Sequence, residues 1–449
     1  MASSKTADRA APESWRSDFG RLWTAQTIAV FGGEITGVAI PLTAVALLGA
    51  SALQMGVLAA AATMPNLLFA FYFGVLADRV QRRWSLLVGA NLVRIVLYGL
   101  VPVAWLGGFL STELLIAIAF AGGTAGTCFR IAWSSFLPSV VPAENLVEAN
   151  GKLRTSMTIS GLTGVGVAGV LVQLFGGPMA VAVNAAAFAA AAGFLLTMRD
   201  RGPRRAVPSG RRQKTWNEVV EGLRYMVGEP RMRAIAGSAA NLNLFSSVVL
   251  ALYVLYASRE LAIPPSLIGL LFVVWGIGAV SGAMLAAPVG RRFSEGRTIV
   301  GASAVFSLVL FAYPASAYGP LWLSVTVLAV ANLIFGASIF LFDVHTAALR
   351  QRETADELQG RAAAVMTFIT QGVKPLGALL GGVLGEAIGV RGALWVAAVG
   401  ALTTVLWTYF SPLRDPVRDP VRDPVRVPVR DPAAEVSHQD AVLRDSGAQ

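Results

Sequence analysis

The chain has 449 residues, of which 55% are hydrophobic and only 14% are charged, with a formal net charge of +10 and a mean hydropathy of +0.63. Soluble domains carry about 25% charged residues, so the composition excludes an ordinary soluble enzyme, a nucleic-acid-binding module and a disordered protein. The single cysteine, Cys128, excludes an intrachain disulfide.

The segment 1–20 is polar and has no hydrophobic stretch after its charges. A cleavable signal peptide needs such a stretch. We therefore expect 1–20 to form a cytoplasmic N-terminal segment.

Long uncharged stretches follow this segment. A transmembrane helix needs about 20 apolar residues, and turn signals such as Gly176-Gly177-Pro178 divide the longest stretches into two. The sequence thus predicts an all-α integral membrane protein with twelve spans. Their expected limits are 21–49, 53–77, 84–106, 112–137, 153–175, 179–198, 232–257, 266–289, 298–316, 320–346, 361–385 and 392–411.

The Lys and Arg residues predict the orientation of these spans, because cytoplasmic loops carry an excess of both. Almost all of the 36 Lys and Arg residues fall in the loops of one side, if the N-terminus is placed inside. The loops of the other side carry only Arg259 and Arg391. We therefore expect both termini to be cytoplasmic.

Two charged segments set the domain boundaries. The basic segment 199–231 divides the chain into bundles at 21–198 and 232–411, and we expect a cytoplasmic linker with a short amphipathic helix on the membrane surface. Residues 412–449 contain imperfect RDPV repeats. Regular prolines exclude a stable helix, so we expect a disordered cytoplasmic tail.

The two bundles also resemble each other weakly. The residues from Gly74 to Arg83 have a counterpart that runs from Gly282 to Arg292, and AENL at 143–146 has a counterpart in ADEL at 355–358. The two counterparts follow at nearly the same separation along the chain, which indicates a repeat of six helices that keeps its orientation.

The loop between the second and third spans carries the most specific motif. It reads GVLADRVQRR, with Gly74, Asp78, Arg79, Arg82 and Arg83. This loop resembles the G-x-L-x-D-R-x-G-R-R motif of the major facilitator superfamily, with Gln81 in place of the second glycine. FLPSVVPAENLVEANGKL (136–153), ALRQRETADELQGR (348–361) and PLGALLGGVLGEAIGVRGAL (375–394) are similar to the branch of macrolide-efflux and enterobactin-exporter proteins. The resemblance implies two pseudo-symmetric six-helix bundles in a bacterial plasma membrane.

The sequence departs from these relatives inside the membrane. Val165 stands where the antiporter motif of the family has proline. Relatives often carry an acid at the positions of Asn91, Arg130 and Asn184, and an arginine at Thr367. A substrate therefore does not follow from a relative.

Ionisable residues within spans are costly and mark candidate functional sites. Glu34 and Asp343 are candidate proton-coupling acids, since a carboxylate in a cavity can exchange a proton with either side as access alternates. Arg94, Arg130 and Lys374, together with Asn184, are candidates to line the substrate cavity. The alternatives stay open: Glu34 as a fixed partner of a buried cation, Lys374 as a partner of Asp343 or Glu34, and structural roles for both arginines.

The motif loop and the glycines suggest how the halves move. The resemblance implies that Asp78 lies at the positive N-terminus of the span that begins near Gly360, and forms a cytoplasmic gate with the loop arginines. The alternative is that Arg79, Arg82 and Arg83 only fix the topology. Glycines allow close helix contacts where halves can rock, or ordinary tight packing. The candidates are Gly161, Gly164, Gly169, Gly377, Gly381 and Gly382.

No nucleotide-binding, nucleophile or metal-ligand motif occurs in the sequence. We therefore expect no enzyme activity and no cofactor or metal. The expected function is a secondary transporter, a proton-coupled exporter of an amphiphilic small molecule such as an antibiotic, drug or siderophore. The alternatives are an importer or uniporter of a nutrient, and a non-transporting membrane sensor. The expected partners are this substrate, protons and lipids, with no nucleic acid, and the chain is expected to be a monomer.

Overall fold

A computed structural model of the chain describes residues 11–80, 83–198 and 214–414, without the side chains of residues 11–14, 78, 135, 214–220 and 414. Six long helices form the N-terminal half. They are α1 (Ala11–Leu42), continued by the π-helical turn η1 (Thr43–Leu47), α2 (Ala52–Arg79), α3 (Arg83–Leu106), α4 (Thr112–Val140), α5 (Leu146–Phe175), which the 3-10 turn η2 (Ala143–Asn145) precedes, and α6 (Gly177–Leu196).

The C-terminal half contains six further spans. Its helices are α8 (Pro230–Leu255), continued by the π-helical turn η3 (Tyr256–Glu260), α9 (Pro265–Arg292), α10 (Glu295–Val309), which ends in α11 (Ala312–Ala315) and η4 (Ser316–Tyr318), α12 (Leu321–Glu353), α13 (Asp356–Ile388), and α14 (Val390–Tyr409), which η5 (Pro412–Arg414) follows. A shorter helix, α7 (Lys214–Gly228), precedes α8. Twelve helical segments of the described residues are long and apolar enough to cross a membrane. The predicted all-α fold with twelve spans is confirmed.

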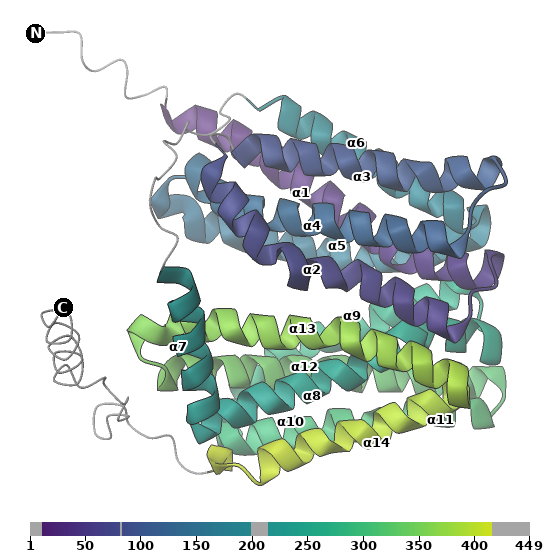
Figure 1. Cartoon of the computed structure of the whole chain (residues 1–449), viewed down its shortest axis with the longest axis vertical. Helices are drawn as coiled ribbons and strands as arrows, with labels where there is room; N and C mark the ends of the chain where they lie inside the picture. The colour runs from purple at the N-terminus through teal and green to yellow at the C-terminus, as the bar shows by residue number, and fades with distance from the viewer. Residues whose placement is uncertain (1–10, 81–82, 199–213, 415–449) are drawn as a thin grey trace, which may run out of the picture. The chain divides into compact units, whose positions relative to one another are not determined.

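The spans form two bundles, one from each half, with their helices roughly parallel to one another (Figure 1). We call one end of these bundles the basic end. There α2 passes into α3, α4 into α5, α9 into α10 and α12 into α13. We call the other end the Arg-poor end, because its described loops and helix termini contain only Arg259 and Arg391 as basic residues.

Several helices begin earlier than the sequence predicted. The first helix begins at Ala11, inside the segment expected to precede the spans, and the eleventh span begins at Asp356 instead of 361. The polar start of α1 is stabilised by packing, because Asp18 is buried and accepts a hydrogen bond of 3.1 Å from Arg21. Arg21 also donates to the carbonyl of Thr197 at 2.8 Å. Residues 1–10, 199–213 and the tail from 415 lie outside the described residues.

At the Arg-poor end, backbone features of the first half recur in the second half at one constant separation along the chain. The π-helical turn η1 begins at Thr43 and its counterpart η3 begins at Tyr256. The positive-φ glycines that precede α6 and α14, Gly176 and Gly389, have φ values of 79° and 80° and are separated by the same offset. Gly49 and Ala262 follow the two π-helical turns with φ values of 69° and 52°, again at this offset. The local backbone is thus repeated even where the side chain differs.

The amphipathic helix expected in the linker corresponds to α7. It runs crosswise over the basic end of the C-terminal bundle (Figure 1). Glu221 pairs with Arg361 of α13 at 2.6 Å, and Met226 is buried. The Tyr225 hydroxyl donates to the carbonyl of Glu353 at 3.1 Å, and burial raises the pKa of Tyr225. These contacts fix α7 to the bundle.

Candidate functional site

The two halves contact each other near the Arg-poor end. Three hydrogen bonds between the halves occur there among the described residues. They run from the Arg259 guanidinium to the Val45 carbonyl at 3.1 Å, from the Leu53 amide to the Glu386 carboxylate at 3.3 Å, and from the Ser266 amide to the Gln173 side chain at 3.2 Å. The halves are therefore closed at the Arg-poor end.

Two glycine pairs allow the backbones of the two halves to approach closely in this contact. A Cβ atom built on Gly56 of α2 would lie 2.6 Å from the Gly382 Cα atom of α13. A Cβ atom built on Gly169 of α5 would lie 2.9 Å from the Gly269 Cα atom of α9. Gly269 follows Gly56, and Gly382 follows Gly169, by the same offset that separates the two π-helical turns. The two contacts between the halves are thus related to each other by the repeat.

The other candidate glycines pack within their own bundles or against nothing. Gly161 has no atom within 4 Å of an added Cβ, whereas Gly164 packs against α1. Gly377 and Gly381 pack against α8, close to the Leu244 carbonyl and to Val248. Of the six candidates, only Gly169 and Gly382 lie between the halves. Their partners Gly269 and Gly56 were not predicted, because 46 glycines occur in the chain and spacing alone does not distinguish them.

Lys374 of α13 lies within electrostatic range of two charged side chains, one from its own half and one from the other half. Lys374 of α13 attracts Asp343 of α12 without forming an ion pair, and it repels Arg130 of α4. Arg130 donates a hydrogen bond to the amide oxygen of Asn66 on α2. Arg130 and Asp343 are exposed and Lys374 is half-buried. Charged side chains within a membrane span rarely face lipid tails, so we expect these groups to face the interior of the protein or water.

Arg94 is the remaining candidate cation of the N-terminal half. Its guanidinium lies 5.2 Å from the ring centre of Phe129 and 4.9 Å from that of Phe188. It also repels Arg130. In the described part of the chain no hydrogen bond or ion pair involves Arg94, so two aromatic rings alone support its charge.

Glu34 lies apart from these cations. A Cβ atom on Gly164 would lie 3.0 Å from the Glu34 Cβ atom, so the acid sits where α1 meets α5. The Glu34 side chain is half-buried. Among the described residues its carboxylate has no hydrogen-bond or ion-pair partner, so the structure pairs it with none of the three candidate cations.

Buried amides are concentrated in the N-terminal bundle. Asn184 of α6 donates a hydrogen bond to the Thr36 hydroxyl of α1, but its own oxygen has no partner. Asn91 of α3 is fully buried, and neither of its side-chain polar atoms has a partner within the described residues. Asn184 therefore lies in the bundle core against α1 and is not open to the space between the bundles.

The motif loop is described only in part. The side chain of Asp78 and the whole of Arg82 lie outside the described residues. Arg79 is exposed, and Arg83 donates to the Ala77 carbonyl at 3.1 Å. Gly74 has open space where a Cβ would lie. The proposed contact between Asp78 and α13 stays a prediction.

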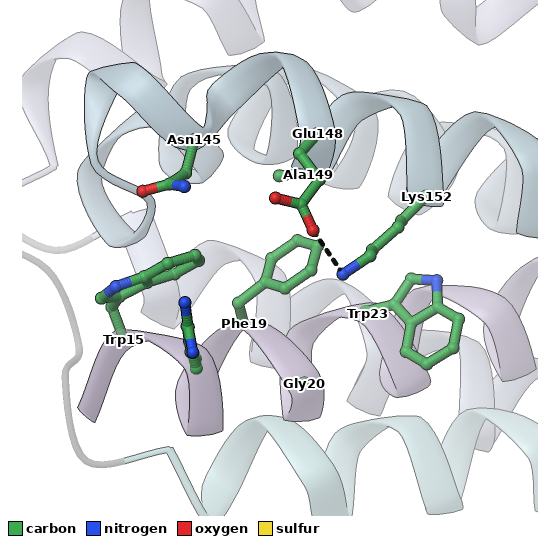
Figure 2. Close-up of a pocket in the computed structure, with 9 residues that line it drawn as sticks. Trp15, Phe19, Gly20, Trp23, Asn145, Glu148, Ala149 and Lys152 are labelled. Carbon is green, nitrogen blue, oxygen red and sulfur yellow. Dashed lines mark ion pairs between the residues drawn. The ribbon is translucent and has the colours of Figure 1, made fainter. Parts of the chain in front are cut away.

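A separate pocket of about 590 Å³ lies between α1 and α5 at the basic end. Figure 2 shows the aromatic rings of Trp15, Phe19 and Trp23 on α1 facing the ion pair of Glu148 and Lys152 on α5. Trp15, Phe19 and Trp23 recur every fourth residue, which is a helical signal that the sequence interpretation did not use. Aromatic and charged groups together suit an amphiphile or the membrane interface.

The described residues contain no group of three or more His, Cys, Asp or Glu side chains that could hold a metal ion.

Comparisons with known proteins agree with this architecture. A family model described as transmembrane secretion effector matches residues 11–437. The chain is similar to the multidrug efflux pump Tap of Mycobacterium tuberculosis (strain ATCC 25618 / H37Rv), at 26% identity over 399 residues that cover 85% of this chain and 90% of Tap.

Solved transporters share the fold. A mutant of the nucleoside transporter NupG superposes with a TM-score of 0.70 at 12% identity, covering 88% of this chain and 99% of NupG. A bacterial homologue of the iron transporter ferroportin in the inward-facing state gives 0.68 at 16% identity, covering 87% and 98%. A bacterial ferroportin homologue in the outward-facing state gives 0.54 at 18% identity, covering 87% and 98%.

Proposed function

The chain belongs to the transmembrane secretion effector family of the major facilitator superfamily, and on that premise we propose that it is a proton-coupled exporter of an amphiphilic small molecule. It is a multi-pass membrane transporter. The similarity to a multidrug efflux pump over 85% of the chain is the observation that carries the proposed direction. An antibiotic, a drug or a siderophore has the chemistry expected of the substrate.

We place the chain in a bacterial plasma membrane with both termini in the cytoplasm. The basic end then faces the cytoplasm, as the excess of Lys and Arg in its loops favours. The Arg-poor end, with Arg259 and Arg391, faces outward.

With this orientation the structure corresponds to an inward-facing state. The glycine pairs Gly56–Gly382 and Gly169–Gly269 close the outer side, and the charged groups between the halves are reached from the cytoplasm. The higher TM-score with the inward-facing ferroportin homologue supports this assignment. Alternating access then requires these glycine contacts to separate while the basic end closes, and Asp78 would stabilise that second state at the start of α13.

Glu34 is the proposed proton carrier. Its lack of a fixed partner among the described residues supports this role, because an acid held in an ion pair would keep its charge in both states. Asp343 is the second candidate acid, but Lys374 attracts it. A monomer contains both halves of the site and needs no second copy, although membrane lipids contact its outer surface.

The direction of transport is tested by the accumulation of fluorescent amphiphiles in cells with and without the protein. Export predicts lower accumulation in expressing cells and restoration of that accumulation by a protonophore. It also predicts resistance to the antibiotics that are transported. Equal accumulation in both strains for every compound would contradict export.

Uptake of a nutrient is the second candidate function. The similarity of the fold to the nucleoside transporter NupG favours it. Higher accumulation in expressing cells, abolished by a protonophore, would establish uptake in place of export. A sensor that does not transport would change accumulation in neither direction.

A further inference from the structure

The charged groups between the two bundles do not balance. Arg130 and Lys374 are two cations from opposite bundles, and Asp343 is the one carboxylate that interacts with either of them among the described residues. Glu34 does not compensate this charge, because it interacts with none of these cations in the described part of the chain. An uncompensated cation at this depth is costly, so the site is complete only when a further negative charge is present.

Direct contacts between helices bring the two sides of this site together. Arg130 is hydrogen-bonded to Asn66, and the next residue of α2, Leu67, reaches α13. A Cβ atom on Gly372 would lie 3.3 Å from the Leu67 Cδ1 atom. Lys374 lies just beyond Gly372 on α13. This contact brings α2 and α13 together at the level of Arg130 and Lys374, and the charge of Arg130 acts on Lys374.

Both cations keep donors free for a ligand. The Arg130 guanidinium uses one nitrogen for the neutral Asn66 amide, and a guanidinium has five N–H donors. Lys374 attracts Asp343 but forms no ion pair with it, so its ammonium group is available. Two neighbouring cations that repel each other and keep free donors are the arrangement that recognises an anion.

We propose that the transported molecule carries an anionic group, a carboxylate, phosphate or sulfonate, which binds between Arg130 of α4 and Lys374 of α13. This inference rests on the proposed transport function and names its substrate class. Because one cation belongs to each bundle, the bound anion replaces their repulsion by two attractions. Binding therefore favours approach of the two bundles at this level, which is the first step in closing the basic end.

The test is a binding measurement that needs neither a gradient nor transport. The full chain in lipid nanodiscs is titrated with dansylglycine and with dansylglycinamide, two fluorophores that differ only by a carboxylate in place of a neutral amide. The wild type is expected to bind dansylglycine about tenfold more tightly or better, since charge-assisted hydrogen bonds to two cations are lost with the amide.

Three substitutions locate this preference. Arg130→Gln and Lys374→Gln should each bring the affinity ratio of the two probes close to 1, and Lys374→Arg should retain the preference. Asp343→Asn removes the competing carboxylate and should increase the ratio. Arg154→Gln, which removes an exposed cation of α5 that is not part of the site, is the matched control and should leave the ratio unchanged.

Each contrary result overturns the inference. Equal affinity for both probes, binding of neither, or a preference that survives both glutamine substitutions would show that the site does not select an anion. Sulfate that competes with both probes equally would assign the site to a small inorganic anion instead of the substrate. If the protein prefers the anionic probe but does not export in cells, only the proposed function is contradicted. If it exports neutral compounds and shows no preference for the anionic probe, only the inference is contradicted.

Discussion

Gly169 of α5 lies against Gly269 of α9 so closely that a Cβ atom added to either residue would lie 2.9 Å from the Cα atom of the other. Gly56 and Gly382 form the corresponding contact between α2 and α13. In a membrane, small residues allow backbones to approach without a competing hydrophobic force between the helices. Each pair therefore joins the two bundles at the Arg-poor end, which is closed in this structure.

Alanine at Gly169 or Gly382 should destabilise the closed Arg-poor end. Overpacking of a tight contact costs about 1–3 kcal/mol, and about 1.4 kcal/mol is a tenfold change in population. The variants should therefore shift the population toward the state that is open at this end. Pulsed electron–electron double resonance measures this shift as a change in distance between two spin labels. The labels are attached to cysteines at the exposed positions Leu174 and Ile388, in a background lacking Cys128.

Gly161→Ala is the matched control, because it lies on the same helix as Gly169 and has open space where the methyl group would lie. It should leave the distance distribution unchanged. An unchanged distribution in Gly169→Ala would show that this contact does not hold the end closed.

The second prediction uses the repeated backbone at Gly49 and Ala262. Both have positive φ, a conformation that costs a residue with a Cβ atom about 1–2 kcal/mol. Gly49→Ala should therefore lower the thermal stability of the purified chain in detergent, whereas Ala262→Gly should preserve or raise it. A Cβ atom on Gly49 meets no closer atom than an Arg259 nitrogen at 3.8 Å, so steric overlap does not explain the loss. Lower stability of Ala262→Gly than of Gly49→Ala would contradict this account.

The spans could be predicted from the sequence because hydrophobicity and loop charge act over whole segments. The separation between the two repeats was predicted to within a few residues, although the sequence segments that showed it lie at the basic end. The start of α1 was missed, since the structure stabilises its polar turns through Asp18 and Arg21, a tertiary contact that composition does not contain.

The candidate site was predicted only as a set of residue types. Arg94, Arg130, Lys374, Asp343 and Glu34 follow from the cost of charge in the membrane. Which of them interact depends on the packing of different helices, so the grouping of Lys374 with Asp343 stayed one of several alternatives and the isolation of Glu34 was not predicted.

The third prediction concerns the ion pair between Arg231 of α8 and Glu353 of α12. Both side chains are buried, with exposed fractions of 6% and 9%. Removal of one partner leaves a buried charge, so Arg231→Met should destabilise the chain by about 3–5 kcal/mol. Thermal unfolding in detergent measures this loss, and Arg231→Met combined with Glu353→Leu should recover much of it.

The exposed pair of Lys152 and Glu148 provides the comparison. Its members are 55% and 62% exposed, and such pairs contribute about 0–1 kcal/mol. Lys152→Met should therefore change the melting temperature little. Equal losses in Lys152→Met and Arg231→Met would show that burial does not set the cost.

The fourth prediction tests the docking of α7 on α13. A Cβ atom on Gly222 would lie 3.1 Å from the Arg361 carbonyl oxygen and 3.1 Å from Val365. Gly222→Val should therefore displace α7 and speed hydrogen exchange of its amides. Gly228→Ala, at the end of the same helix with open space around it, should not. Equal exchange rates in Gly222→Val and the wild type would contradict docking through this face.

Proton coupling of transport is tested most directly by Glu34→Gln in sealed inside-out vesicles. Glutamine keeps the shape of the protonated acid but releases no proton. With an imposed pH gradient, wild-type vesicles and the Glu113→Gln control, whose carboxylate lies at the Arg-poor end, should concentrate a fluorescent amphiphilic substrate. Glu34→Gln should bind the substrate and equilibrate it without concentrating it. Uphill accumulation by Glu34→Gln at the wild-type rate would contradict Glu34 as the proton carrier, and a wild type that never responds to the gradient would contradict proton-coupled export.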